Sequence, residues 1–197
     1  MDSTIRIAIF ASGSGSNAQK IIEYFQGDTQ TQIPLIVTEN KKAGVIQRAS
    51  HFGIPVAHIG KPLYRQGDYL VSLLKGHSID LVVLAGYLKK VPETLVKHYP
   101  KRILNIHPAL LPAFGGKGMY GMNVHNAVIS SGCTNSGMTI HYVNEVYDEG
   151  EIVFQAKIPI ESHWTAIDLQ KAIQKLEHAN YPLIIEKVCQ RIRIDKK

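Results

Sequence analysis

The sequence predicts a three-layer α/β/α domain whose central β-sheet contains parallel strands. Short apolar runs alternate with amphipathic helical patterns over the first half of the chain, which is the order of repeated βαβ units. A length of 197 residues is typical of one compact domain, so we predict a single domain over residues 1–197. A content of 45% hydrophobic and 19% charged residues is that of a folded chain and excludes a disordered one.

The elements of the first half are predicted from the period of the apolar residues. Apolar runs predict strands at residues 5–10, 33–37, 55–59, 80–85 and 103–106. Apolar residues at helical spacing predict helices at residues 18–25, 43–52 and 69–74. Gly27 and Gly53 follow the first two helices and are expected to end them.

The second half starts with a glycine-rich loop at residues 108–122, a composition that does not favour regular structure. A short helix at residues 124–129 and strands at 138–143 and 152–158 are predicted to follow. Thr165 is expected to cap a long final helix, with Asp168 as the acidic partner of a capping box. Pro182 is predicted to kink or divide that helix, because proline cannot donate the helical hydrogen bond.

Composition narrows the class of protein without selecting its partner. The net charge of +6 is compatible with nucleic acid, a membrane surface or small anions. No nucleic-acid motif is present, and the basic residues are not interleaved with aromatic ones, so nucleic-acid binding is not expected. No apolar run approaches the ~20 residues of a spanning helix, and the N-terminus lacks a signal-peptide pattern. We therefore expect a cytoplasmic protein that does not contact a membrane.

The cysteines and histidines offer no pattern typical of a metal site. Cys133 and Cys189 form no spaced framework and are predicted to be free, mostly buried thiols. None of the nine histidines belongs to an HExxH motif, and neither cysteine is part of a CxxC pair. We therefore expect no metal.

A turn rich in glycine and serine joins the first predicted strand to the first predicted helix. Residues 12–17 read SGSGSN. Free N–H groups at a helix N-terminus suit a phosphate, and the serine hydroxyls with the Asn17 amide favour a terminal phosphate monoester. The spacing of Gly13, Gly15 and Ala18, with Glu39 after the second strand, also satisfies a dinucleotide-binding pattern. Phosphate binding is the favoured interpretation, and a dinucleotide site is the alternative.

Asn105 and His107 interrupt an apolar strand at its carboxyl end, where open α/β sheets bind ligands. An amide can donate to an oxygen that gains negative charge, and an imidazole can supply or hold a proton, so the pair suggests acyl-type transfer. A carboxylate beside His107 would raise the pKa of that imidazole. Glu145, Asp148 and Glu149 are the candidates, and the loop pattern does not choose among them.

Taken together, these motifs resemble those of the phosphoribosylglycinamide formyltransferases, a family of folate-dependent enzymes. The resemblance extends from about residue 5 to residue 182. It rests on SGSGSN at 12–17, VVLAGYL at 82–88, LNIHPALLP at 104–112, DEG at 148–150 and LEHANYP at 176–182. It implies a Rossmann-like fold with a seven-stranded, mostly parallel sheet. It also implies transfer of the formyl group of 10-formyltetrahydrofolate to the amine of glycinamide ribonucleotide in purine biosynthesis.

The resemblance also implies roles for single residues. Asn105, His107 and Asp148 match the catalytic amide, imidazole and carboxylate of the family. The positions that match ribonucleotide contacts are Gly15, Ser16, Asn17, Gln174 and Glu177. The positions that match folate contacts are Arg65, Leu88, Lys89, Lys90, Val91, Asn105, Val146 and Asp148. The implied partners are these two small molecules, without metal, nucleic acid or membrane, and the protein is expected to be a monomer or homodimer.

The sequence departs from the common family pattern in two places. The loop GGKGMYGM at residues 115–122 is longer than usual, and Glu149 stands where glycine is frequent, so a local difference in the folate loop is expected. Relatives that formylate methionyl-tRNA or hydrolyse formyltetrahydrofolate carry a further domain. We therefore expect the small phosphorylated substrate.

Overall fold

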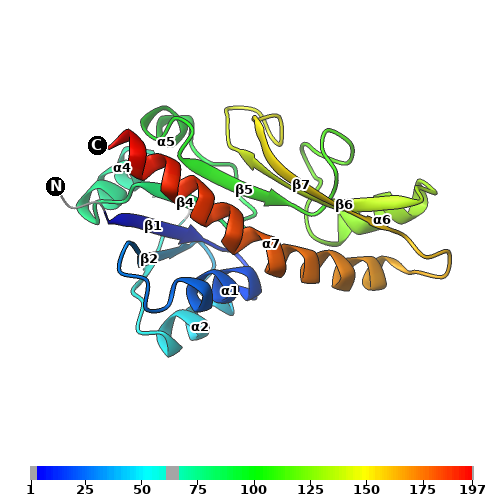
Figure 1. Cartoon of the computed structure of the whole chain (residues 1–197), viewed down its shortest axis with the longest axis horizontal. Helices are drawn as coiled ribbons and strands as arrows, with labels where there is room; N and C mark the ends of the chain where they lie inside the picture. Colours follow the sequence, from blue (N-terminus) through cyan, green and yellow to red (C-terminus); the bar gives the residue numbers. More distant parts are fainter. Residues whose placement is uncertain (1–3, 61–66, 197) are drawn as a thin grey trace. The chain divides into compact units, whose positions relative to one another are not determined.

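The computed structural model describes residues 4–60 and 67–196. Its strands form a seven-stranded sheet in the order β3-β2-β1-β4-β5-β6-β7 (Figure 1). Strand β1 pairs in parallel with β2 and with β4, β2 pairs in parallel with β3, and β6 pairs antiparallel with β7. The predicted α/β fold with a mostly parallel sheet is therefore confirmed.

Every predicted strand and helix is present among the described residues, with boundaries that differ by a few residues. The elements in chain order are β1 (Ile5–Phe10), α1 (Ser16–Phe25), β2 (Thr31–Thr38), α2 (Val45–His51), β3 (Val56–His58), α4 (Gly67–Gly76), β4 (Leu81–Leu84), α5 (Glu93–His98), β5 (Ile103–His107), α6 (Met122–Ser130), β6 (Asn135–Tyr142), β7 (Ile152–Pro159) and α7 (Ala166–Asp195). The short helix α5 is an addition that sequence analysis did not predict.

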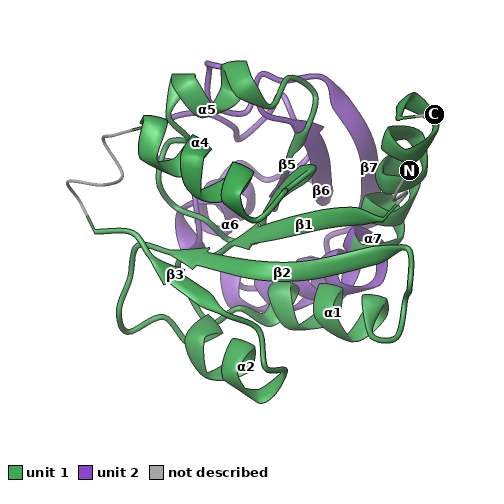
Figure 2. Cartoon of the chain, turned by 90° about the vertical axis from the view of Figure 1, so that its left-hand side faces the viewer, with its two compact units in different colours: residues 1–104, 182–197 green, residues 105–181 purple. Residues whose placement is uncertain are grey.

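The chain divides into two compact units, which Figure 2 distinguishes by colour. Unit 1 comprises residues 1–104 and 182–197. Its strands β1 and β4 are almost entirely buried, as expected for inner parallel strands covered on both faces. The last turns of α7 add buried apolar side chains to this unit, namely Ile185, Val188 and Ile192.

Unit 2 comprises residues 105–181 and contains the end of β5, α6, the β6–β7 pair and the first half of α7. Met138 and Ile140 of β6 are fully buried. The predicted capping box starts α7: Asp168 Oδ2 accepts from the Thr165 N–H at 3.0 Å, and Thr165 Oγ1 accepts from the Asp168 N–H at 3.3 Å. This arrangement satisfies donors that a helix N-terminus leaves unpaired.

Two predictions about single residues need correction. Helix α7 continues through Pro182, so the predicted division of the helix is wrong. Packing of apolar neighbours such as Tyr181 and Ile185 offsets the ~3 kcal/mol that an internal proline costs. Both cysteines are free, but only Cys189 is buried; Cys133 is exposed, because it lies in the turn before β6. In the part of the chain that the structure describes, no helix is both long and apolar enough to cross a membrane.

Candidate active site

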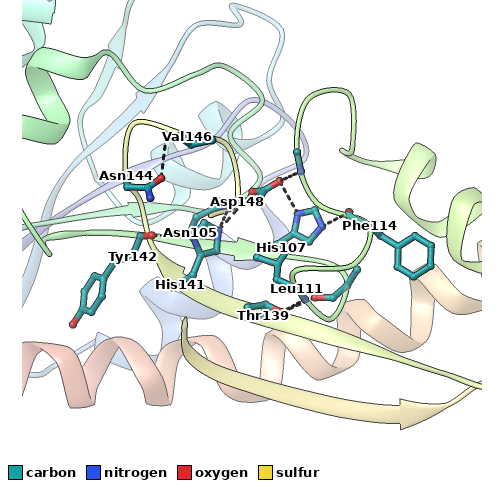
Figure 3. Close-up of polar contacts among 12 residues, drawn as sticks. Asn105, His107, Leu111, Phe114, Thr139, His141, Tyr142, Asn144, Val146 and Asp148 are labelled. Atoms are coloured by element: carbon teal, nitrogen blue, oxygen red, sulfur yellow. Dashed lines mark hydrogen bonds and ion pairs between the residues drawn. The ribbon is translucent and has the colours of Figure 1, made fainter. Parts of the chain in front are cut away.

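Strand β5 presents Asn105 and His107 at its carboxyl end, as the alternation of the sequence predicts (Figure 3). Asn105 is half-buried, and His107 is only 3% exposed. His107 Nε2 lies 2.8 Å from the carbonyl oxygen of Phe114. Because a carbonyl only accepts, Nε2 carries a proton, and Nδ1 is the nitrogen free to exchange one.

The third member of the cluster is Asp148, from the loop between β6 and β7. Its Oδ2 lies 3.6 Å from His107 Nδ1 and accepts a hydrogen bond from the Gly116 N–H at 2.9 Å. Glu145 and Glu149, the other acidic candidates, are exposed. The structure therefore brings Asn105, His107 and Asp148 together.

A second histidine, His141 of β6, completes this cluster, and sequence analysis missed it. His141 is 2% exposed, and its Nδ1 lies 2.9 Å from the Tyr142 carbonyl oxygen. Its Nε2 lies 3.0 Å from Asn105 Nδ2 and 3.6 Å from Asp148 Oδ1. With the proton on Nδ1, Nε2 accepts from the Asn105 amide and fixes its orientation. A histidine inside the apolar run of a buried strand was the available signal.

Burial and the neighbouring carboxylate have opposing effects on the pKa of His107. Burial lowers the pKa of this imidazole below its ordinary value. The Asp148 charge and the Phe114 carbonyl raise the pKa, as predicted for a neighbouring carboxylate, while the neighbouring His141 side chain lowers it. The net direction is downward because burial outweighs the carboxylate. Burial therefore favours the neutral form of this imidazole.

Asp148 remains ionised in spite of its partly buried position. Burial alone would raise its pKa, but the neighbouring His141 and His107 side chains and the Gly116 N–H together lower it. Asp148 also has a positive φ of 57°, a conformation that is uncommon outside glycine. The loop thus holds a charged carboxylate beside two imidazoles.

The loop that carries Asp148 depends on Gly150. A Cβ atom at this position would collide with the carbonyl oxygen of Tyr142, so only glycine fits there. Glu149, where the family often has glycine, is exposed and in no such contact. Of the residues in DEG, the last is therefore the one that the backbone requires.

Thr139 of β6 holds the segment that follows His107. The Thr139 hydroxyl is fully buried, accepts from the Leu111 N–H at 3.0 Å and donates to the Ala109 carbonyl at 2.7 Å. Gln155 of β7 donates to Thr139 Oγ1 and to the Leu111 carbonyl, each at 2.9 Å. These bonds fix the segment that ends at Phe114 and hence the carbonyl that orients His107.

His125 of α6 is another buried histidine that sequence analysis missed. It is 4% exposed. Burial makes the largest contribution to lowering the pKa of its imidazole, and the neighbouring His107 lowers that pKa further. Sequence analysis considered His125 only as a member of possible metal-binding motifs, and its helical position on the buried face of α6 was the signal for its burial.

The predicted phosphate-binding turn lies in unit 1, between β1 and α1. Gly15 has a φ of +77°, and a Cβ there would lie 2.6 Å from Cβ of Val45. Ser16 and Asn17 form the first turn of α1. Helix α2 supports the turn, since the Val45 N–H donates to the Gly13 carbonyl at 3.2 Å and Arg48 Nε donates to the Ser14 carbonyl at 2.8 Å.

The positions that match folate contacts fall in both units. Leu88, Lys89 and Lys90 are exposed after β4, while Val91 is buried. Val146, in unit 2, is 51% exposed, and its N–H donates to Asn144 Oδ1 at 3.0 Å. Arg65 lies outside the described residues.

The two ribonucleotide positions near the C-terminus lie on α7, one turn apart. Gln174 is exposed and Glu177 is half-buried. Burial, with a smaller contribution from the Glu177 charge, raises the pKa of Tyr181 well above its ordinary value. Both positions belong to unit 2.

The cluster of unit 2 combines an amide donor, two imidazoles and a carboxylate. Such a set can stabilise an oxygen that gains negative charge and can hold or pass a proton. Within residues 4–60 and 67–196, no group of three or more His, Cys, Asp or Glu side chains could hold a metal ion.

Comparison with known proteins gives a consistent assignment. The formyl transferase family matches residues 5–185. Phosphoribosylglycinamide formyltransferase of Bacillus subtilis is 35% identical, over 93% of this chain and 94% of that protein. The crystal structure of glycinamide ribonucleotide transformylase 1 from Symbiobacterium toebii has a TM-score of 0.88 and 32% identity, covering 96% of this chain and 90% of that one.

The plant relatives are more similar in sequence but longer. The chloroplastic phosphoribosylglycinamide formyltransferase of Arabidopsis thaliana is 44% identical over 94% of this chain, which spans 65% of that protein. For the Vigna unguiculata protein of the same name, the chain spans 61%. The match over nearly the full length of both the chain and its bacterial relative shows that the chain belongs to the formyl transferase family, among the phosphoribosylglycinamide formyltransferases.

Proposed function

We propose that this protein transfers the formyl group of 10-formyltetrahydrofolate to the amine of glycinamide ribonucleotide, yielding formylglycinamide ribonucleotide and tetrahydrofolate in purine biosynthesis. The observation that carries the proposal is the cluster of Asn105, His107, His141 and Asp148 at the carboxyl end of β5. Formyl transfer needs a group that stabilises an oxyanion and a group that moves one proton, and this cluster supplies both.

The chemistry follows from the orientation of these side chains. The amine nitrogen attacks the formyl carbon, and the carbonyl oxygen gains negative charge opposite the Asn105 amide and, once His107 has taken up the proton that the amine loses, opposite its imidazolium. His107 Nδ1 is the nitrogen that takes up a proton, because Nε2 donates to Phe114. Asp148 then stabilises the imidazolium across 3.6 Å. When the bond to the folate nitrogen breaks, that nitrogen receives the proton that the amine loses.

In this proposal each substrate has its own set of binding residues. The ribose phosphate binds at the N-terminus of α1, to Gly15, Ser16 and Asn17. The glycinamide end of the same substrate contacts Gln174 and Glu177. The folate binds to a second set of residues, namely Arg65, Leu88, Lys89, Lys90, Val91, Asn105, Val146 and Asp148. Since the family match extends over residues 5–185 and so over both units, we propose that they act as one formyltransferase domain.

An assay of product formation tests the proposal. Purified protein is mixed with 10-formyl-5,8-dideazafolate, with and without glycinamide ribonucleotide, and deformylation is followed optically. We expect product only when both substrates are present. Product without the ribonucleotide would identify a hydrolase instead. Absence of folate chemistry together with tight NAD binding would instead identify a dinucleotide site, as suggested by Gly13, Gly15, Ala18 and Glu39. That alternative assigns no function to the cluster around His107.

Location, oligomeric state and the absence of a metal are further parts of the proposal. We propose a cytoplasmic monomer or homodimer without nucleic acid or metal among its ligands. Sedimentation of the purified protein measures the oligomeric state. Full activity after treatment with a chelator is the expected result for catalysis without a metal.

A further inference from the structure

Ser12 lies between the phosphate-binding turn and the segment at residues 86–91. It follows β1 directly and is 5% exposed. Its N–H donates to the Gly86 carbonyl at 3.1 Å, and its hydroxyl oxygen accepts from the Leu88 N–H at 2.9 Å. On its other side, its carbonyl accepts from Asn40 Nδ2 at 3.1 Å. One buried residue thus holds two segments that are far apart in sequence.

These contacts extend the pairing of two neighbouring strands beyond their ends. Phe10 of β1 pairs with Leu84 of β4, and the Ala85 N–H then donates to the Phe10 carbonyl at 2.8 Å. The Ser12 bonds to Gly86 and Leu88 continue this pattern into the loops. Because β2 and β3 lie on one side of β1 and β4 lies on the other, this is the switch point where open α/β sheets bind ligands.

The side chain of Leu88 itself contributes little to holding this segment, since it is 49% exposed. Its neighbour Tyr87 packs edge-on against Phe10, with ring centroids 5.3 Å apart. The hydroxyl of Ser12 therefore accepts a specific bond from a backbone N–H in a segment that also packs through Tyr87.

We propose that Ser12 is a positioning residue that couples the ribonucleotide site to the folate site. This inference rests on the proposed function, in which residues 15–17 bind the ribose phosphate and residues 88–91 bind the folate. A ligand that immobilises the phosphate-binding turn also immobilises Ser12. Through its bond to the Leu88 N–H, Ser12 then orders residues 88–91 for folate binding. Because such coupling is reciprocal, folate strengthens ribonucleotide binding by the same factor.

Calorimetric titration measures this factor. Glycinamide ribonucleotide is titrated into the protein with and without saturating 5,8-dideazafolate, which has no formyl group and allows no turnover. The reverse titration gives the second leg of the cycle. We expect each ligand to tighten the other about fivefold or more in the natural protein, which is the usual lower range for coupled sites.

Substitutions of Ser12 then separate coupling from folding. Ser12→Ala removes the acceptor, and the factor falls towards one. Ser12→Cys, close in size but a much weaker acceptor, behaves in the same way and decides the outcome should Ser12→Ala fail to fold. Asn40→Ala is the matched control, because it removes a bond to the Ser12 carbonyl and leaves the bond to Leu88 intact, so the factor remains.

The possible outcomes are distinct. A factor of one in the natural protein, retention of the natural factor in both Ser12 variants, or equal loss of coupling in Asn40→Ala would each overturn the role of Ser12. Failure of either ligand to bind the natural protein, with no formyl transfer, would overturn the proposed function itself. Transfer without coupling would overturn only the role of Ser12.

Discussion

At the scale of the residue, His107 has two ring nitrogens in different environments. Nε2 donates to the Phe114 carbonyl at 2.8 Å, and Nδ1 faces Asp148 at 3.6 Å. The latter distance exceeds that of a hydrogen bond, so the carboxylate acts on the ring through its charge. The backbone thus fixes the ring, while the carboxylate stabilises its charged form when a proton arrives.

His107→Asn and Asp148→Asn are expected to lower kcat by about 10²–10⁴, the usual contribution of a group that moves a proton, with little change in KM. Steady-state kinetics with both substrates measures the effect. His163→Asn, at an exposed histidine, is the control and keeps natural turnover. Turnover close to the natural value in either site variant would contradict the roles of His107 and Asp148.

Part of the site could be predicted from single residues. Alternation along the strand was enough to place Asn105 and His107 on one face. The choice of Asp148 over Glu145 and Glu149 needed the resemblance, because the loop conformation decides which carboxylate turns inward. The effect of the carboxylate on the pKa of His107 was predicted in the right direction, but the larger opposing effect of burial was not, since the extent of burial is a property of the folded chain that one sequence does not display.

At the scale of the element, Thr139 of β6 holds the segment that contains Leu111 and Phe114. One hydroxyl serves three partners there, Ala109, Leu111 and Gln155. The stability of the segment and the orientation of His107 therefore depend on the same group.

Thr139→Val keeps the shape of the side chain but leaves the Leu111 N–H and the Ala109 carbonyl without their partner. At ~1–3 kcal/mol for each unsatisfied buried group, we expect a loss of about 2–6 kcal/mol in the free energy of unfolding, measured with urea. A fall in kcat should accompany it, because the Phe114 carbonyl shifts. Thr134→Val, at an exposed threonine, is the matched control. Natural stability of Thr139→Val would argue against this role of the hydroxyl.

Elements with a clear period were predicted well, and the exceptions have physical reasons. Strands β1 and β4 were predicted correctly because inner parallel strands are almost entirely apolar. Helix α5 has only six residues, too few to show a helical period, although Pro92 before it and Glu93 in its first turn are typical of a helix start. Pro182 was expected to kink or divide helix α7, and the helix is not divided, because tertiary packing overrides a local preference in a way that is invisible in sequence.

At the scale of the whole molecule, the buried histidines predict how stability depends on pH. Burial lowers the pKa of both His107 and His125, so below about pH 6.5 the unfolded chain binds protons that the native protein does not. The free energy of unfolding should therefore fall as the pH decreases from 7.5 to 5.5, by at most ~1.4 kcal/mol per pH unit for each histidine. Above pH 7 these two groups contribute no slope. Asp148, whose pKa is also lowered, acts only in the more acidic range below its ordinary value of 3.8.

Urea unfolding at the two pH values measures this dependence. In the double variant His107→Asn with His125→Asn, the dependence on pH is expected to become smaller, whereas His163→Asn leaves it unchanged. An unchanged pH dependence in the double variant would show that burial of the two imidazoles is not its source.

Unit 1 is discontinuous in sequence: residues 182–197 join residues 1–104 only after the whole of unit 2 has intervened. Lys196 forms an ion pair with Asp80 at 2.7 Å, and Arg193 donates to the Gln30 carbonyl at 3.1 Å. A ribosome therefore releases β1 to β4 well before the helical turns that cover them. During synthesis unit 1 cannot complete its core until all of unit 2 has been translated. A fragment cut after residue 104 lacks the buried side chains of Val188, Cys189 and Ile192 that complete this core.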